Sequence, residues 1–413
     1  MDEDTFDDRE LSSERLARMD PRQRRQWLEN RVYQKYDEFS PTKDSLDDSF
    51  FGASPPSIFV GRHGYPKVNA GILSPVEHRD SAVFDSPDTW YGDNAAIEEV
   101  IGYRSNLVNS RSTAKVTEVD TFQDEAKEIA MASTPVDVEV ELAKTPDFEL
   151  NFQERSQPFG PAEQVEEVDI TENPSVARAV EKAVSDDDWK AEGAARYLYR
   201  KDLDTYQIQR VLSAGLLGEQ DNRRLVPTRW SITATDDTLG KGLRRDVKQY
   251  QELGEMRLFT NEYNGNFFNV LLIPGQWEYE LVEIKGAGSV WNPGDDAYLA
   301  ANHETYDGRT QYAAETAGAY YAARLGVLEY LHDIQRQAKA LIVRDVTDKY
   351  WAPLGVWVIR ETVRNAFDEE YSIPQNFSQA VQTIDGNISV DLDRVRQKSE
   401  MMEGTQQSVK DFF

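Results

Sequence analysis

The sequence predicts an α+β protein, with a mixed sheet and helices in the main domain, a helical C-terminal region and a flexible C-terminal tail. Residues 136–142 alternate apolar and polar side chains, which is typical of a half-buried strand. Apolar residues recur at helical spacing from Ala317 to Leu331, which is typical of a long helix with one buried face. A second helix is expected at 355–367, and no internal repeat is present.

The length and composition predict a soluble protein with more than one folded unit. Its 413 residues exceed the size of one typical core, and 39% of them are hydrophobic, which is enough to build real cores. Residues 1–10 are acidic and lack the apolar run of a signal peptide. No stretch approaches the ~20 apolar residues of a membrane helix. We therefore expect a cytoplasmic protein that does not bind a membrane.

The chain is strongly acidic, with 46 Lys and Arg against 74 Asp and Glu and a formal net charge of -28. Such a charge disfavours broad, non-specific nucleic-acid binding, which needs a basic surface. One interpretation is an acidic protein that binds partners. The other is adaptation of the whole surface to high salt, in which the field is screened within a few ångströms. The absence of Cys excludes disulfides, Cys-based zinc sites and thiol nucleophiles.

The first part of the chain is predicted to combine short strands with a helix. Residues 1–40 are charged and poor in apolar side chains, so we expect a charged N-terminal extension. Residues 54–62 indicate a turn that leads into a short buried strand, and 63–75 indicate a second strand between turn residues. Residues 120–132 have a capping-box spacing and one apolar face, which favours a helix.

The middle of the chain is predicted to change from loop to helix to strand. Residues 143–173 are rich in Glu, Pro and Gln, which is typical of an irregular loop. Residues 174–218 are predicted to be mostly helical, with glycines as stop residues. Residues 224–291 favour strands, of which 228–234 and 277–284 are examples.

The chain ends in Gln406, two further residues, Val409, two further residues, and then Phe412 and Phe413. This pattern resembles the clamp-interacting peptide of proteins that bind PCNA, the archaeal and eukaryotic sliding clamp. In one turn of 3₁₀ helix, Val409 and Phe412 fall on the same side, with Phe413 beside them, as an apolar plug. Gln406 offers a donor and an acceptor for a second pocket. The alternative is a tail that packs into its own core.

Several runs in the body resemble the archaeal Nre family of DNA repair proteins. They are 54–62 (SPPSIFVGR), 64–69 (GYPKVN), 71–75 (GILSP), 225–241 (LVPTRWSITATDDTLGK) and 355–357 (GVW). The resemblance implies a role in DNA damage repair together with PCNA. The acidic composition fits a member of the family from a salt-loving archaeon.

The resemblance also implies two family regions. We expect a charged extension at 1–40, an α+β domain of the Nre N-terminal type at 41–300, a helical domain of the Nre C-terminal type at 301–400 and a flexible tail at 401–413 that carries the clamp peptide. Many family members begin with a Cys-rich zinc finger. This chain has no Cys, so the corresponding segment cannot hold zinc in that way.

Two groups of residues are candidates for binding a phosphate or a nucleic acid. Arg62 and Lys67 stand near glycines whose backbone amides could cradle a phosphate, although turn chemistry alone explains those glycines. The second group is the densest cluster of polar and aromatic residues in the chain. It consists of Arg229, Trp230, Asp236, Asp237 and Lys241.

The second group has two interpretations. Two adjacent Asp residues after a strand could hold Mg²⁺, with Arg229 and Lys241 on a phosphate and Trp230 stacked on a base. In the alternative, Trp230 is a core residue and the Asp pair opens a helix near Thr238.

The four histidines show no metal-ligand spacing, so the sequence predicts no metal site, and it does not identify a cofactor. His303, Glu304, Asp307 and Arg309 precede the long helix. They could supply an acid–base pair or metal ligands, or they could cap that helix and lie at the surface.

The sequence therefore predicts a DNA repair protein that acts in response to DNA damage and is recruited to PCNA by its C-terminal peptide. The alternative is a nucleotide- or nucleic-acid-processing enzyme with a phosphate site around Arg229 to Lys241, for which DNA or a nucleotide is the expected partner. A pocket that joins Arg62, Lys67 and Arg229 would favour the enzyme. A smooth body with only the tail available would favour an adaptor.

Overall fold

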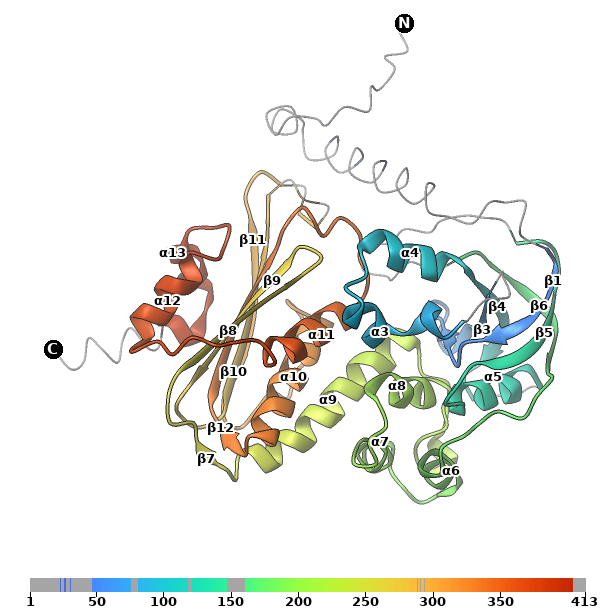
Figure 1. Cartoon of the computed structure of the whole chain (residues 1–413). Coiled ribbons are helices and arrows are strands. Elements are labelled where there is room, and N and C mark those ends of the chain that lie inside the picture. Colours follow the sequence, from blue (N-terminus) through green and yellow to red (C-terminus); the bar gives the residue numbers. More distant parts are fainter. Residues whose placement is uncertain are drawn as a thin grey trace, which may run out of the picture.

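A computed structural model of the chain describes residues 47–75, 81–117, 121–146, 160–287, 289, 291–292 and 294–403, together with 23, 26 and 30 (Figure 1). Almost all of the predicted N-terminal extension, and the whole clamp peptide, lie outside the described residues. Helices and two sheets alternate along the chain, which confirms the α+β class. Within the described part, no helix combines the length and apolar character that crossing a bilayer requires.

The N-terminal half forms a six-stranded sheet of order β1-β5-β6-β4-β3-β2. The pairing is antiparallel except between β4 and β6. The predicted strand at 136–142 is confirmed as β5. The strands are β1 (Ser49–Ser54), β2 (Ile58–Val60), β3 (Lys67–Pro75), β4 (Leu107–Lys115), β5 (Val136–Leu142) and β6 (Ala162–Ile170).

The predicted loop at 143–173 is wrong in its second half, where β6 lies between β5 and β4. Only Val168 of this strand is fully buried. Its backbone groups pair with a neighbour on both sides, so the strand forms without an alternating apolar face.

A five-stranded sheet of order β11-β10-β13-β9-β8 occupies the C-terminal half. Its middle strand, β13, runs parallel to β10 and antiparallel to β9, and it is buried almost throughout. The predicted boundary at residue 300 lies within β11, and β13 comes from the region expected to be helical. The strands are β8 (Arg257–Tyr263), β9 (Asn266–Ile273), β10 (Glu278–Lys285), β11 (Tyr298–Glu304) and β13 (Lys339–Val346), with a separate pair of β7 (Gln251–Glu252) and β12 (Arg336–Gln337).

The predicted helices at 120–132, 317–331 and 355–367, and the mostly helical character of 174–218, are confirmed. The N-terminal half contributes η2 (Ala82–Asp85), α3 (Pro87–Gly92), α4 (Ile97–Ser105), α5 (Thr121–Met131), α6 (Arg178–Ser185), α7 (Ala191–Tyr199), α8 (Thr205–Ser213) and η3 (Gln220–Asn222). The C-terminal half contributes α9 (Thr228–Val247), α10 (Gly318–Asp333), α11 (Trp357–Ala366), α12 (Phe377–Asp385) and α13 (Leu392–Lys398).

The strand predicted at 228–234 is wrong, because these residues form the first two turns of α9. Their β-branched and aromatic side chains favour a strand locally, but tertiary packing overrides that preference. One face of the helix repeats at steps of four and packs against α8 and α10. Its buried members are Ser231, Thr235, Leu239, Leu243 and Val247.

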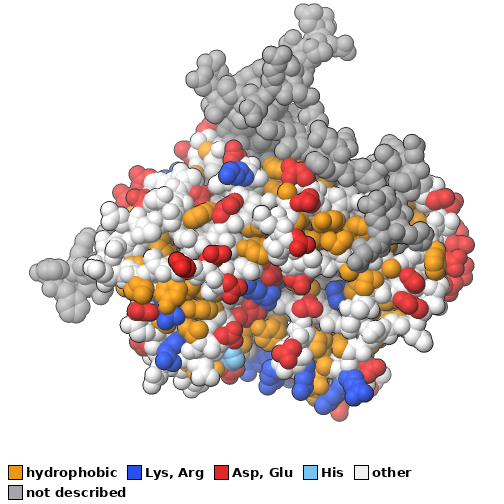
Figure 2. Space-filling model, viewed as in Figure 1, with side chains coloured by type: hydrophobic (Ala, Val, Ile, Leu, Met, Phe, Trp, Pro, Cys, Tyr) orange, Lys and Arg blue, Asp and Glu red, His pale blue; other side chains and the backbone are white. Residues whose placement is uncertain are grey.

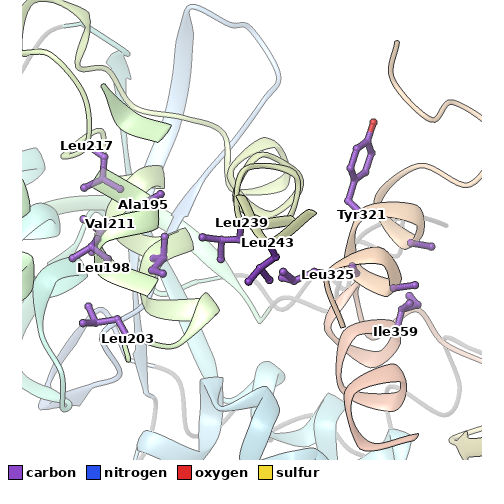
Figure 3. Packing of buried hydrophobic residues seen from close by; sticks show 14 of the residues in the cluster. Ala195, Leu198, Leu203, Val211, Leu217, Leu239, Leu243, Tyr321, Leu325 and Ile359 are labelled. Carbon is purple, nitrogen blue, oxygen red and sulfur yellow. The ribbon is translucent and has the colours of Figure 1, made fainter. Parts of the chain in front are cut away.

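Helices α9, α10 and α11 lie between the two sheets, and α12 and α13 cover the opposite side of the five-stranded sheet (Figure 1). One apolar core runs from the six-stranded sheet through these central helices to the five-stranded sheet. Figure 3 shows part of this path, from Leu198 and Val211 through Leu239 to Leu325 and Ile359. On the outside, acidic side chains are spread over most of the visible face, as Figure 2 shows.

The end of the described chain is fixed to the five-stranded sheet by the buried carboxylate of Glu280. It accepts hydrogen bonds from Ser399 Oγ at 2.6 Å and from the backbone N–H groups of Glu400 at 2.9 Å and Met401 at 3.0 Å. The side chains of Met401 and Met402 enter the core between the sheet and α12 and α13. These contacts hold residues 399–402 immediately before the terminal peptide, and this held segment is called the anchor.

His303 of β11 makes a second contact with this segment, through Glu400. Its Nε2 lies 2.9 Å from Glu278 Oε1, and its Nδ1 lies 3.1 Å from Glu400 Oε2. Burial lowers the pKa of His303, but the hydrogen bond to Glu278 and the charge of Glu400 outweigh it, so the pKa lies above its ordinary value. The hydrogen bond from His303 holds the pKa of Glu278 at about 2, so that carboxylate stays charged near neutral pH.

We predict that the anchor weakens as pH rises. Because the pKa of His303 is raised on folding, its stabilising contribution is complete below its ordinary value of about 6.5 and is lost as pH rises through the folded value. Hydrogen exchange of the Glu400 and Met401 amides should therefore report local opening that becomes easier over this range. A His303→Gln variant should show no such change. The same pH dependence in both proteins would contradict the prediction.

Candidate functional site

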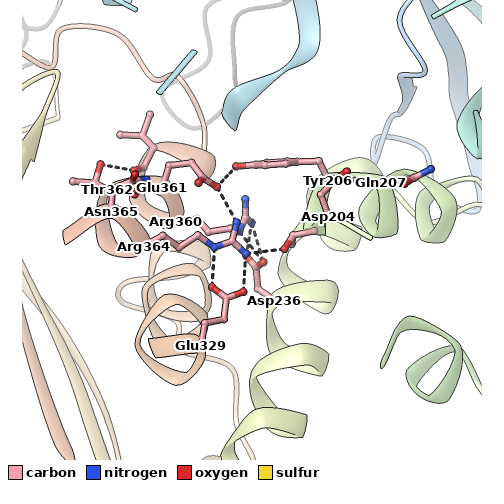
Figure 4. Close-up of polar contacts among 12 residues, drawn as sticks. Asp204, Tyr206, Gln207, Asp236, Glu329, Arg360, Glu361, Thr362, Arg364 and Asn365 are labelled. Carbon is pink, nitrogen blue, oxygen red and sulfur yellow. Dashed lines mark hydrogen bonds and ion pairs between the residues drawn. The ribbon is translucent and has the colours of Figure 1, made fainter. Parts of the chain in front are cut away.

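The two adjacent aspartates, for which binding of Mg²⁺ was one of two interpretations, both bind arginines. Asp236 is fully buried, and its Oδ1 accepts from Nε and Nη2 of Arg360 at 3.1 and 2.9 Å while its Oδ2 accepts from Nη2 at 2.6 Å. Figure 4 shows this pair between α9 and α11. Asp237 binds Arg324 at 2.7 Å and Lys241 at 2.6 Å. Neither carboxylate faces a place for Mg²⁺, and the described residues contain no group of three side chains that could hold a metal.

The network around Asp236 extends to α8 and α10. Tyr206 Oη donates to Glu361 Oε1 at 2.6 Å, and the guanidinium of Arg364 binds Glu329 at 2.8 Å (Figure 4). These contacts join α8, α10 and α11 around the middle of α9. Two residues of this network, Tyr206 and Arg360, also line a pocket.

The acid–base pair proposed for His303 and Glu304 does not form. Both residues belong to β11, where successive side chains point to opposite faces. His303 faces the anchor, whereas Glu304 is buried on the helix side and binds Arg324 at 2.9 Å and Trp277 Nε1 at 3.0 Å. His303 and Glu304 thus end the edge strand β11, whereas Asp307 and Arg309 lie between this strand and the long helix α10.

Four of the seven predicted phosphate-site residues are exposed and come from the start of α9 or from the segment that leads from β2 into β3, namely Arg62, Lys67, Arg229 and Trp230. The backbone N–H of Val60 donates to Thr228 Oγ1 at 2.9 Å, which ties β2 to this helix end. Trp230 is 46% exposed and is therefore not a core residue, and its ring lies 5.2 Å from that of Tyr65, which is 41% exposed. Arg62 and Lys67 lie within three residues of Tyr65 in the sequence, Arg229 directly precedes Trp230, and all three cations are exposed.

Lys241 lies further along α9, away from the exposed surface at its start. It comes eleven positions after Trp230, which corresponds to about 16 Å along the helix axis. With Asp236 and Asp237 engaged by arginines, the single cluster predicted from the sequence divides into an exposed surface and an internal network.

A pocket opens on the other side of the α9 start, and sequence reasoning did not find it. Its empty volume is about 660 Å³, including the open space at its mouth. Four of the runs that carry the family resemblance converge on it through Ile58, Leu73, Thr228 and Trp357. The full lining is Ile58, Phe59, Leu73, Asp85, Pro87, Arg104, Tyr206, Gln209, Arg210, Ser213, Thr228, Ser231, Ile232, Trp357 and Arg360.

Three guanidinium groups line this pocket, and two of them have a carboxylate. Arg104 binds Asp85 at 2.5 Å, and Arg360 binds Asp236. The third, Arg210, forms no ion pair or hydrogen bond through its side chain within the described structure, and its Nε is buried. Burial lowers the pKa of Arg210, against the opposing influence of Asp204, Asp85 and Asp88.

A periodic feature of the sequence could have indicated the pocket. Tyr206, Gln209, Arg210 and Ser213 have the i, i+3, i+4, i+7 spacing of one helix face. This face is polar, although the helix lies inside the molecule. Polar side chains along one face of a largely buried helix indicate a polar pocket inside the molecule.

The comparisons with known proteins assign the family. The model for the N-terminal region of archaeal Nre matches residues 30–292, and that for its C-terminal region matches 304–412. The chain belongs to the archaeal Nre family, as the resemblance indicated. No solved structure matches it.

Three relatives cover most of the chain. DNA repair protein NreA of Haloferax volcanii is 46% identical over 96% of this chain and 98% of its own length. DNA repair protein NreA of Archaeoglobus fulgidus is 39% identical over 81% of this chain and 84% of its own. DNA repair protein NreB of the same organism is 35% identical over 89% and 93%.

We predict that the Asp236–Arg360 pair controls stability. Asp236→Ala should lower the free energy of unfolding by about 3–5 kcal/mol, because Arg360 would remain buried without its counter-charge. Asp236→Leu combined with Arg360→Met should cost much less, since both charges are then absent. Chemical denaturation of the variants measures these differences.

Lys241→Ala is the matched control, because it removes a more exposed pair on the same helix. It should cost less than about 1 kcal/mol. An Asp236→Ala protein as stable as the Lys241→Ala protein would overturn the assignment of Asp236 as a structural residue.

Proposed function

We propose that this chain is a DNA repair protein that acts in response to DNA damage and is recruited to the PCNA sliding clamp by its C-terminal peptide. The names of its relatives support the repair role. The observation that carries the clamp proposal is the terminal pattern of Gln406, Val409, Phe412 and Phe413. The cytoplasm is the compartment that this role requires.

The anchor supports the proposal, because it defines where the peptide leaves the body. Glu403 is the last described residue, and it follows the segment held by Glu280 and His303. The ten residues after it span at most about 36 Å. A clamp that holds Phe412 and Phe413 therefore stays close to α12 and α13.

The chemistry of the peptide suits a protein with a net charge of -28. Binding by an apolar plug does not depend on attraction between surface charges, which concentrated salt would screen. Ordering the peptide lowers the net affinity, and a moderate affinity allows partners of the clamp to exchange.

We predict that Phe412→Ala with Phe413→Ala in the full chain weakens binding to PCNA of the same organism at least about 100-fold. Each buried Phe contributes roughly 1.5–3 kcal/mol, and 1.4 kcal/mol corresponds to a factor of ten. Titration calorimetry in high salt measures the change. Ser408→Ala with Lys410→Ala is the control, since the pattern leaves these positions free. Equal affinity of the Phe variant and the wild type would end the clamp proposal.

A second function, contact with a single nucleic-acid strand, is favoured by the exposed pair of Tyr65 and Trp230. Aromatic faces stack on bases, and neighbouring cations hold the backbone. Arg62, Lys67 and Arg229 supply exposed cations close to the pair in the sequence. This local surface therefore offers cations and aromatic rings for binding a nucleic acid, although the net charge of the chain is -28.

For this second function we predict that Tyr65→Ala with Trp230→Ala weakens binding of a short single-stranded DNA about 10- to 100-fold, since stacking contributes about 1–3 kcal/mol per base. Fluorescence anisotropy of a labelled oligonucleotide provides the measurement. Tyr298→Ala removes an aromatic ring of similar exposure on the five-stranded sheet and should leave binding unchanged. Wild-type affinity in the double variant would remove this surface from consideration.

A further inference from the structure

The pocket beside α9 has one apolar side and one polar side. Ile58, Phe59 and Leu73 from the six-stranded sheet form its apolar side together with Ile232 and Trp357. The polar side comes from α8. It consists of Tyr206, Gln209, Arg210 and Ser213. Such a division suits a ligand with an apolar ring system at one end and a hydrogen-bond acceptor at the other.

The charges of the pocket leave one cation without a counter-ion. Arg104 and Arg360 are each neutralised by an aspartate. Arg210 is not, and the nearby Gln209 also has a buried amide nitrogen, Nε2, without a partner in the described structure. The half-buried Arg210 has a buried Nε without a hydrogen-bond partner, and leaving such buried donors unsatisfied is costly. An external anion would supply the missing partner for both groups.

We infer that this pocket binds a nucleoside phosphate, with the phosphate on Arg210 and Gln209 and the base against the apolar side formed by Phe59 and Trp357. A guanidinium group forms strong, charge-assisted hydrogen bonds to phosphate oxygens. A small inorganic anion would leave the apolar side formed by Ile58, Phe59 and Leu73 unfilled. The choice of a nucleoside phosphate over other organic anions rests on the proposed role in DNA repair.

The position of the pocket agrees with this ligand. Thr228, Ser231 and Ile232 of α9 line the pocket, while Trp230 of the same turn points to the surface where it meets Tyr65. The aromatic surface and the pocket therefore share one helix end. The phosphate can belong to a free nucleotide or to the 5′ end of a strand that stacks on the surface outside.

The test measures binding of five probes to the full chain in high salt by calorimetry. They are deoxyadenosine monophosphate, deoxyadenosine, inorganic phosphate and a short oligonucleotide with or without a 5′-phosphate. We expect binding of the monophosphate, or of the 5′-phosphorylated oligonucleotide alone if the source is a strand end. Arg210→Met should weaken that binding at least about tenfold. Arg200→Met, on the exposed end of α7, should leave it unchanged.

Stability of the free protein provides a second measurement. Arg210→Met removes a half-buried guanidinium group that forms no ion pair and whose Nε is buried without a partner, so the variant should melt at the same temperature as the wild type or higher. A clear loss of stability would mean that Arg210 is a structural residue. The inference is also overturned if no phosphorylated probe binds, if inorganic phosphate or the nucleoside binds as well as the monophosphate, or if Arg210→Met binds like the wild type.

The clamp proposal can fail independently of this inference. The Phe412→Ala, Phe413→Ala protein should keep nucleotide binding, and the Arg210→Met protein should keep clamp binding. Loss of clamp binding with intact nucleotide binding would overturn the recruitment proposal alone. The reverse result would overturn only the pocket.

Discussion

The placement of α9 is the constraint on which the rest of the structure depends. Asp236 of this helix binds Arg360 of α11, and Asp237 binds Arg324 of α10. A buried ion pair is tolerated only when its geometry is good, so the two pairs fix the rotation of α9 against both neighbours. That rotation turns Trp230 outward and Thr228 toward the pocket. The functional surfaces at the start of the helix therefore follow from charges buried in its middle.

Periodicity in the sequence was sufficient for elements with a repeating apolar face, such as β5 and α10. It failed for β6, which is held mainly by backbone pairing, and for the start of α9, whose local preference is overridden by packing. Part of the candidate site was also predictable: Arg62 and Trp230 share a surface because a turn and a helix start reach it. The sequence could not predict that Arg104 and Arg210 line the same pocket, because only the packing of α4 and α8 brings them there.

The acidic composition explains why an unpaired arginine matters. With 74 acidic residues against 46 basic ones, most cations in the interior have a carboxylate within reach, as Arg324, Arg344 and Arg360 do. On the face that Figure 2 shows, acidic side chains are widely spread, and the net charge of the chain is -28. Long-range attraction then cannot hold a nucleic acid, and recognition has to come from short-range contacts. Stacking on an exposed ring and a guanidinium in a pocket are contacts of that kind.

The anchor and the pocket lie on opposite parts of the molecule. Segment 399–402 is fixed beside α12 and α13, whereas the pocket lies between α8, the start of α9 and the six-stranded sheet (Figure 1). A clamp bound to the terminal peptide would stay next to the first part, because the peptide is short. The central helices then act as a rigid spacer, since one continuous core joins both sheets. In the proposed complex, the five-stranded sheet and the central helices would lie between the clamp and the elements that carry the pocket and the aromatic surface.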